Sequence, residues 1–187
     1  MSFDIAGFLN NLSIFIVPFM FAISIHEASH GFMAYLLGDN TAKDMGRLTL
    51  NPIKHVDIVG LLVLQISQMI GWAKPVLVDT RKVGRVKYGM LMVAAAGPVS
   101  NFIFDFISAL LLKLLLFLFT LDVTDFIPLK VIEFLLLTVQ TSIRINVVLA
   151  IFNLIPLLPL DGGRILFELL PRDKAAVYAK IEPYGMI

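Results

Sequence analysis

Four apolar runs alternate with polar segments along the chain, at residues 12–37, 58–72, 88–120 and 131–160. A helix needs about 20 mostly apolar residues to cross a hydrocarbon core of about 30 Å. The first, third and fourth runs therefore predict membrane-spanning helices. The second run would reach only about 22 Å as a helix at 1.5 Å per residue, so it predicts a segment that enters the membrane and returns.

The polar segments between these runs predict loops and short elements. Residues 38–57 form a loop rich in Gly, Asp, Asn, Lys and Thr, and residues 73–87 form a basic segment. Within the basic segment, the alternation Lys74-Pro75-Val76-Leu77-Val78 predicts a short strand. The fourth run ends in a Pro- and Gly-rich break, after which a short helix over residues 164–170 and a charged tail are expected.

The composition indicates whether the surface of the protein faces water or lipid. Hydrophobic residues make up 58% of the 187 residues and charged residues 16%, against about 25% charged in soluble domains. This excludes an ordinary soluble domain and a disordered chain, so the surface is expected to face the lipid bilayer. The net charge of +1 without a basic run disfavours nucleic acid. Because cysteine is absent, disulfides, thiolate metal sites and cysteine nucleophiles are excluded.

The first apolar run contains His26-Glu27-Ala28-Ser29-His30, an HExxH pattern. Histidines at i and i+4 share one helix face and can bind one zinc, while the glutamate can take a proton from water. The plain alternative is two helix histidines satisfied by neighbouring groups. Three ionisable side chains inside an apolar helix are costly in lipid, however, and this setting favours a metal site.

A catalytic zinc needs a third protein ligand. The remaining histidine, His55, lies in a polar loop and is not an obvious ligand. The acidic candidates in or beside apolar runs are Asp105, Glu133, Asp161 and Glu168. Asp161 precedes Gly162-Gly163 in an irregular segment, which is tolerated at membrane depth only where it lines a cavity. Its alternative role is to cap the following helix, and the two roles can coexist.

These motifs together resemble the site-2 protease family of intramembrane zinc metalloproteases. The resemblance rests on the HExxH pattern and on Asn153-Leu154-Ile155-Pro156-Leu157-Leu158-Pro159-Leu160-Asp161-Gly162-Gly163. Gly97-Pro98-Val99-Ser100-Asn101 is similar to the family's Gly-Pro-x-x-Asn helix. Residues 46–57 and 71–76 resemble its compact prokaryotic branch without a PDZ domain, although Ile58 stands where that branch has proline.

The resemblance implies an all-α polytopic membrane protein with about three spanning helices, a re-entrant segment and short β-strands near the active site. It implies a single membrane-embedded metalloprotease domain over residues 1–187, in a prokaryotic cell membrane. Related chains continue past Tyr184 into another apolar helix, so a final helix is expected to be missing. The implied activity is hydrolysis of peptide bonds in transmembrane protein substrates, that is, regulated intramembrane proteolysis.

The resemblance also assigns residues. It implies one Zn²⁺ held by His26, His30 and Asp161, with Glu27 as the catalytic base that activates the zinc-bound water. Asn153 would donate a hydrogen bond to the substrate carbonyl.

Four further residues are candidates for substrate binding. Lys74 and Val76 lie in the predicted strand, whose edge could hold an extended substrate by strand addition; an ordinary interfacial hairpin is the equal alternative. Asn101 is expected to position helix packing or a ligand. His55 is expected to orient its loop or to contact the cleft.

Depth and charge predict the topology. With three crossings, Asp161 reaches the side of the membrane near His26 and His30, whereas four crossings would separate them. Lys130 alone then lies on the opposite side, and twelve basic residues lie on the side of the metal ligands: Lys43, Arg47, Lys54, Lys74, Arg81, Lys82, Arg85, Lys87, Arg164, Arg172, Lys174 and Lys180. By the positive-inside rule that side is cytoplasmic.

Two charges lie deep in the spanning runs, Asp105 and Arg144. An ion pair between them is expected because unpaired charges at this depth are expensive; alternatively, Arg144 faces a water-filled cavity. Two rival functions are a zinc transporter and an inactive helix-binding scaffold. A transporter would need polar groups across the whole bilayer, and a scaffold would be expected to have lost His26, Glu27 or Asp161.

Overall fold

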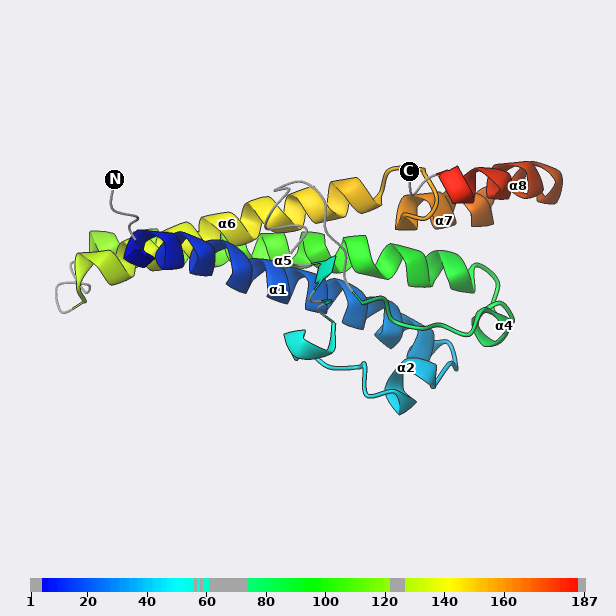
Figure 1. Cartoon of the computed structure of the whole chain (residues 1–187), viewed down its shortest axis with the longest axis horizontal. Helices are drawn as coiled ribbons and strands as arrows, with labels where there is room; N and C mark the ends of the chain where they lie inside the picture. Colours follow the sequence, from blue (N-terminus) through cyan, green and yellow to red (C-terminus); the bar gives the residue numbers. More distant parts are fainter. Residues whose placement is uncertain (1–4, 56, 58, 61–73, 122–126, 185–187) are drawn as a thin grey trace.

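Three long helices run side by side along the molecule (Figure 1). The computed structural model describes residues 5–55, 57, 59–60, 74–121 and 127–184. The helices are α1 (Ile5–Leu36), α5 (Gly89–Thr120) and α6 (Leu129–Asn153). α5 runs antiparallel to α1 and α6 and packs against both.

The predicted membrane-spanning helices are confirmed. Length and hydropathy identify Leu12–Leu36, Gly89–Thr120 and Leu129–Asn153 as candidate spans. α6 ends at Asn153, earlier than the apolar run, because Pro156 and Pro159 lack the amide hydrogen that a helix needs and disfavour helical backbone in the residue before them. The apolar residues that follow α6 form a turn that leads into α7 (Asp161–Leu169).

The packing of the spanning helices suits lipid as the solvent. Fully buried positions carry small or polar residues, among them Ala22, Ala150, Asn101 and Asn146. Large apolar side chains point outward instead, with Phe106 65% exposed. Because lipid tails are as apolar as leucine, membrane helices associate through small residues and hydrogen bonds rather than through a hydrophobic core. The chain is therefore an integral membrane protein.

The shorter helices lie along the half of the molecule where α1 ends and α5 begins (Figure 1). They are α2 (Thr41–Asp44), η1 (Pro52–Lys54), α4 (Thr80–Val83), α7, α8 (Arg172–Tyr178) and η2 (Ala179–Tyr184). The charged tail is thus helical, and Tyr178 Oη anchors it by donating a hydrogen bond to Pro156 O (2.9 Å). The short helix predicted over residues 164–170 is α7, and it begins earlier, at Asp161.

The second apolar run lies mostly outside the described residues, but its flanks are described. Lys74 N–H donates a hydrogen bond to His55 O (2.8 Å), so the chain before the run lies beside the chain after it. Residues 74–79 belong to neither helix nor strand, and the part of the chain that the structure describes holds no strand. The strand predicted over residues 74–78 is therefore not found; Pro75 has no N–H to give to a ladder.

The expected ion pair between Asp105 and Arg144 is wrong. Both residues are described, and no ion pair joins them: the Arg144 side chain points to the exposed surface of α6, while Asp105 Oδ1 is buried without a hydrogen-bond partner. Equal depth in the membrane does not suffice for pairing, because the rotation of each helix about its axis decides which side chains face each other.

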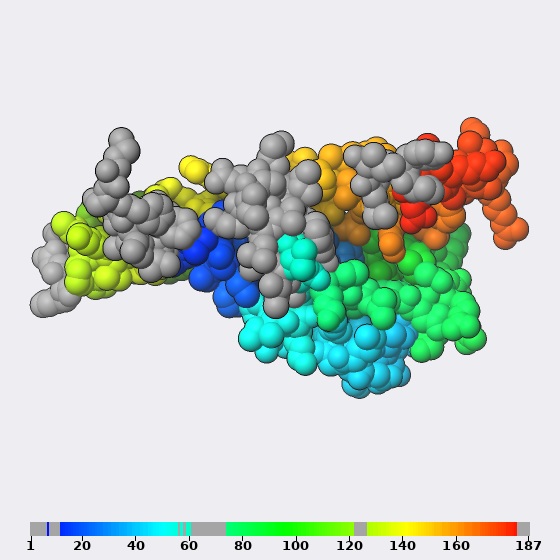
Figure 2. Space-filling view, in the orientation of Figure 1, coloured from blue at the N-terminus to red at the C-terminus, as the bar shows by residue number. Residues whose placement is uncertain are grey.

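A buried carboxylate ties the end of α1 to the segment that leads into α5. Asp39 Oδ1 accepts hydrogen bonds from Thr41 N (3.0 Å), Thr41 Oγ1 (2.5 Å) and Lys82 Nζ (3.3 Å), and Asp39 Oδ2 accepts one from Asp79 N (2.7 Å). The two joined segments form one continuous surface (Figure 2). Burial by itself would raise the pKa of Asp39, but the hydrogen bonds from Thr41, Asp79 and Lys82 outweigh it and hold the pKa below its ordinary value.

The substitution Asp39→Asn is expected to destabilise the fold by about 1–3 kcal/mol, because an amide turns its NH₂ toward one of the buried donors. Since the folded-state pKa is lowered, the carboxylate stabilises the fold above the ordinary carboxyl pKa of about 3.9 and loses this contribution as the pH falls through the folded value. Thermal unfolding in detergent should show a gap between wild type and variant at neutral pH that narrows below about pH 4. The exposed Asp44→Asn is the control; an equal loss in that variant would contradict the role of Asp39.

Candidate metal centre

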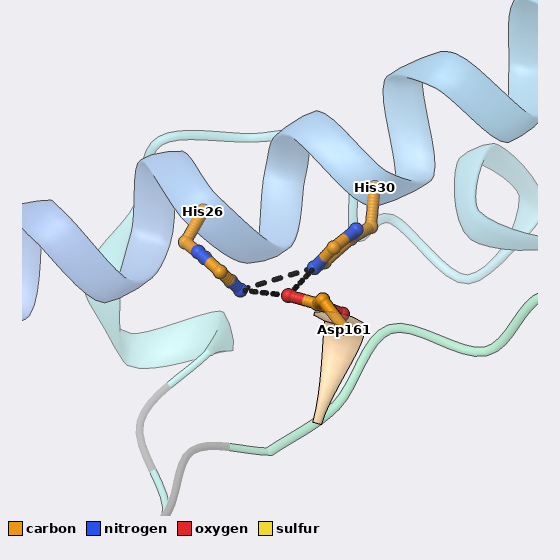
Figure 3. A group of neighbouring side chains, drawn as sticks. All are labelled: His26, His30 and Asp161. Atoms are coloured by element: carbon orange, nitrogen blue, oxygen red, sulfur yellow. Dashed lines mark hydrogen bonds and ion pairs between the residues drawn. The ribbon is translucent and has the colours of Figure 1, made fainter. Parts of the chain in front are cut away.

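Three side chains from two segments that are far apart in the sequence meet at one point (Figure 3). His26 and His30 project from one face of α1, and Asp161 is the first residue of α7. The two Nε2 atoms lie 3.0 Å apart, and Asp161 Oδ2 lies 3.1 Å from that of His26 and 3.3 Å from that of His30.

Hydrogen bonds on the far side of each imidazole fix which nitrogen carries the proton. His30 Nδ1 lies 2.7 Å from Val93 O, which can only accept, so Nδ1 is the donor. His26 Nδ1 lies 2.6 Å from Asn101 Oδ1, and the Asn101 amide nitrogen is occupied in donating to Asn146 Oδ1 (2.8 Å). In their neutral form, both histidines therefore present an unprotonated Nε2 to Asp161.

With neutral imidazoles, three lone pairs therefore converge at one point. Asp161 Oδ2 is buried and receives no hydrogen bond. Burial alone would raise the pKa of Asp161, but hydrogen bonds and positive charge from His26 and His30, when these are protonated, outweigh burial and hold the pKa well below its ordinary range. A bound cation would favour the ionised carboxylate in the same way. Two neutral acceptors and an anion so close together repel each other unless a cation lies between them.

The spacing fits a tetrahedral zinc site. Zinc lies about 2.0–2.1 Å from histidine nitrogen and carboxylate oxygen, which sets tetrahedral ligands about 3.3 Å apart. The observed separations of 3.0–3.3 Å are close to this value. Among the described residues, this is the one group of three or more His, Cys, Asp or Glu that could hold a metal; Asp105, Glu133 and Glu168 do not belong to it.

Glycines allow the backbone to approach the site this closely. A Cβ at Gly97 on α5 would lie 2.4 Å from His30 Nε2 and 2.6 Å from His26 Cε1. A Cβ at Gly162 would lie 2.2 Å from Leu154 O, so only glycine lets α7 fold back against the end of α6. Any larger residue at these positions would displace the ligands or the turn that carries Asp161.

The alternative role of Asp161 as a helix cap is wrong. α7 begins at Asp161 itself, its N-cap residue is Leu160, and no side chain makes a capping hydrogen bond. The Asp161 carboxylate lies in the first turn, where the helix dipole favours a negative charge. It is therefore free to face the histidines.

A cavity of about 390 Å³ opens beside the three side chains. Glu27, Val76 and Asn153 are among the residues that line it, together with all three candidate ligands. Glu27 Oε2 accepts a hydrogen bond from Val76 N (2.9 Å), and Glu27 Oε1 accepts none from the described residues. Asn153 Nδ2 donates to Leu149 O of its own helix (2.9 Å), which leaves its second amide hydrogen free.

Four further residues are predicted to contact a substrate, and one of them lines the cavity. Val76 lines the cavity, and the neighbouring Lys74 is exposed outside it. Asn101 and His55 are fully buried, and neither lines the cavity. Asn101 contacts the candidate ligand His26 instead, and His55 donates from Nε2 to Thr49 O (2.7 Å). The burial of both side chains argues against direct contact with a substrate.

Sequence reasoning named Asn101 as a residue that could position packing or a ligand, but it missed two other groups behind the histidines, Val93 and Asn146. Val93 contributes only its backbone carbonyl, for which the sequence holds no signal. Asn146 is different, because an amide side chain in the middle of an apolar spanning run is itself a sign of an interhelical hydrogen bond.

Comparison with known proteins agrees with the geometry. The model of "Peptidase family M50" matches residues 127–186. A Bacillus subtilis protein named "Putative zinc metalloprotease YwhC" is 37% identical over 172 residues, which cover 92% of this chain and 76% of the relative. No solved structure matches the chain. A relative of this identity and coverage shows the family: the chain belongs to peptidase family M50, the site-2 protease family of zinc metalloproteases.

Proposed function

We propose that this chain is a single-domain intramembrane protease that holds one zinc through His26, His30 and Asp161 and hydrolyses peptide bonds of transmembrane protein substrates. The observation that carries the proposal is the convergence of two bare Nε2 atoms and one buried carboxylate oxygen beside Glu27. When bound, zinc supplies Lewis-acid polarisation of a carbonyl group and lowers the pKa of water.

Glu27 is the general base in this proposal. Its Oε2 is held by Val76 N–H, and its Oε1 faces no donor among the described residues. Oε1 takes one proton from the attacking water as the water oxygen bonds to the scissile carbonyl carbon. Glu27 then gives that proton to the amide nitrogen as the C–N bond breaks, so the products are a carboxylic acid and an amine, which ionise to a carboxylate and an ammonium group at neutral pH.

The cavity walls offer two kinds of substrate contact. Asn153 has one amide hydrogen free to donate to a substrate carbonyl. Across the cavity, residues 75–78 form an irregular stretch that makes no backbone–backbone hydrogen bond within the described chain. An unwound substrate segment would pair with these free backbone groups, which is the chemistry of strand addition, with Val76 inside the cavity and Lys74 at its exposed margin.

We further propose three membrane crossings with the cavity toward the cytoplasm of a prokaryotic cell. The hydrogen bond between Lys74 and His55 supports a second apolar run that enters and leaves on one side. The bond between Asp39 and Asp79 supports the same arrangement. Because twelve basic residues then lie on the side of the cavity, the positive-inside rule makes that side cytoplasmic.

Replacing Glu27 by Gln is expected to preserve zinc binding and to reduce cleavage by about 10²–10⁴-fold, since the amide cannot take a proton. The assay follows cleavage of single-pass transmembrane peptides by mass spectrometry and zinc content by elemental analysis. Glu133→Gln, on the exposed surface of α6, is the matched control. Normal cleavage by Glu27→Gln would exclude Glu27 as the base.

Metal removal should abolish cleavage, and added zinc should restore it. The purified chain is expected to contain one zinc, and Asp161→Asn is expected to lower the zinc affinity strongly because it removes an anionic ligand. Asp173→Asn, an exposed aspartate of α8, should retain the metal. Chelator-resistant cleavage, or unchanged zinc content in Asp161→Asn, would overturn the assignment.

The topology is testable with single cysteines, because the natural chain has none. A cysteine in place of Arg81 should resist a membrane-impermeant thiol reagent added outside intact cells and react after lysis. A cysteine in place of Lys130, at the other end of the helices, should react from outside. Labelling of the Arg81 position from outside would mean that residues 58–72 cross the membrane.

A further inference from the structure

α6 contributes no candidate metal ligand, yet it carries a fully buried amide that faces the site from the middle of the membrane span. Asn146 is 0% exposed, as is Asn101 on α5. These two residues, the asparagine pair, connect α6 to His26 on α1 through two hydrogen bonds. Neither residue lines the cavity, so the pair is not available to a substrate.

The orientation of each amide in the asparagine pair is fixed by a backbone carbonyl. Asn146 Nδ2 donates to Ser142 O (2.8 Å), so Asn146 Oδ1 must be the atom that faces Asn101. Asn101 Nδ2 donates to Asn146 Oδ1 (2.8 Å) and to Ala22 O (3.3 Å). Because carbonyl oxygens only accept, neither amide can be flipped without losing these bonds.

The direction of these hydrogen bonds determines which atom of Asn101 faces His26 at the metal site. With its nitrogen committed to Asn146, Asn101 offers only Oδ1 to His26 Nδ1, at 2.6 Å. An oxygen acceptor at this distance requires hydrogen on Nδ1, so Nε2 is left with the lone pair that a metal needs. A flipped Asn101 would present NH₂ to Nδ1 and would favour the opposite tautomer, with hydrogen on the atom that faces Asp161.

We propose that Asn146 is a positioning residue of the metal site: acting through Asn101, it holds His26 in the tautomer that leaves Nε2 free for zinc. This inference rests on the proposed function, since it concerns the same zinc. It assigns α6 a part in metal binding even though α1 and α7 carry all the ligands.

Zinc affinity of variants is the first test, measured by competition with a fluorescent chelator on monodisperse protein in detergent. Asn146→Leu is close in size and removes the acceptor for Asn101. Loss of groups behind a metal ligand typically costs 10–100-fold in affinity. We expect about a tenfold loss, the lower limit, because Ala22 O still holds the Asn101 amide.

Matched variants separate this role from general damage to α6. In Asn146→Asp, burial should keep the carboxyl group neutral. Its carbonyl oxygen can then accept from Asn101 and its O–H can donate to Ser142 O, so this variant should bind zinc nearly as well as wild type. Thr138→Val removes a hydrogen bond to Phe134 O within the same helix and should leave the affinity unchanged. Asn146→Ala removes the same acceptor without adding bulk and is measured alongside Asn146→Leu, so that a folding failure of one variant does not decide the result.

The tautomer of His26 is the second test, and it uses the wild-type chain. The chain has only three histidines, so ¹⁵N-histidine labelling gives a spectrum that can be assigned completely. In metal-free protein at about pH 8, where unperturbed imidazole is neutral, we expect His26 and His30 to carry hydrogen on Nδ1. His55, which donates from Nε2 to Thr49 O, should show the opposite tautomer and serves as the internal reference.

The inference would be overturned by hydrogen on Nε2 of His26 in the wild type. It would also be overturned by wild-type zinc affinity in Asn146→Leu and Asn146→Ala, or by an equal loss in Thr138→Val. A wild-type chain that binds no zinc would overturn the proposed function instead, and the His26 tautomer would still report whether the asparagine pair orients this ring.

Discussion

A lone pair buried at membrane depth has no water to satisfy it, and this constraint organises the structure. The Nδ1 atoms of His26 and His30 each have a protein partner, whereas Nε2 of His26, Nε2 of His30 and Oδ2 of Asp161 meet one another. The partners of the two Nδ1 atoms leave both Nε2 atoms bare, and the anionic carboxylate completes the set. A cation at this point would relieve the repulsion, so the polar network and the proposed metal site depend on the same hydrogen bonds.

Such a network requires helix backbones to approach more closely than large side chains permit. Gly97 lets α5 pass directly over the two imidazoles, and Gly162 lets α7 return against the end of α6. The rest of the interior follows the same logic, with alanine, serine and asparagine between the helices and phenylalanine and leucine outside. Packing and chemistry therefore depend on the same small residues.

The cavity wall opposite Asn153 is held at two points. Val76 N–H is bonded to the carboxylate of Glu27, and Asp79 N–H is bonded to the buried carboxylate of Asp39. Between these anchors the backbone is irregular and unpaired within the described chain. The wall is thus held at two points, and the backbone between them could pair with an extended peptide, as the proposed substrate binding would require.

The sequence by itself determined the solvent, the three spanning helices and the metal-binding chemistry, because hydropathy over 20 residues and the spacing of His26 and His30 are local properties of one helix. It narrowed the candidates for a third ligand to a few acidic residues, among which the family resemblance indicated Asp161. Only the tertiary structure decided what depends on helix rotation and on contacts between distant segments. It separated Asp105 from Arg144, buried Asn101 behind His26, and joined that residue to Asn146. The physical reason is that a spanning run fixes how deep a side chain lies, whereas the neighbouring helices fix which way it faces.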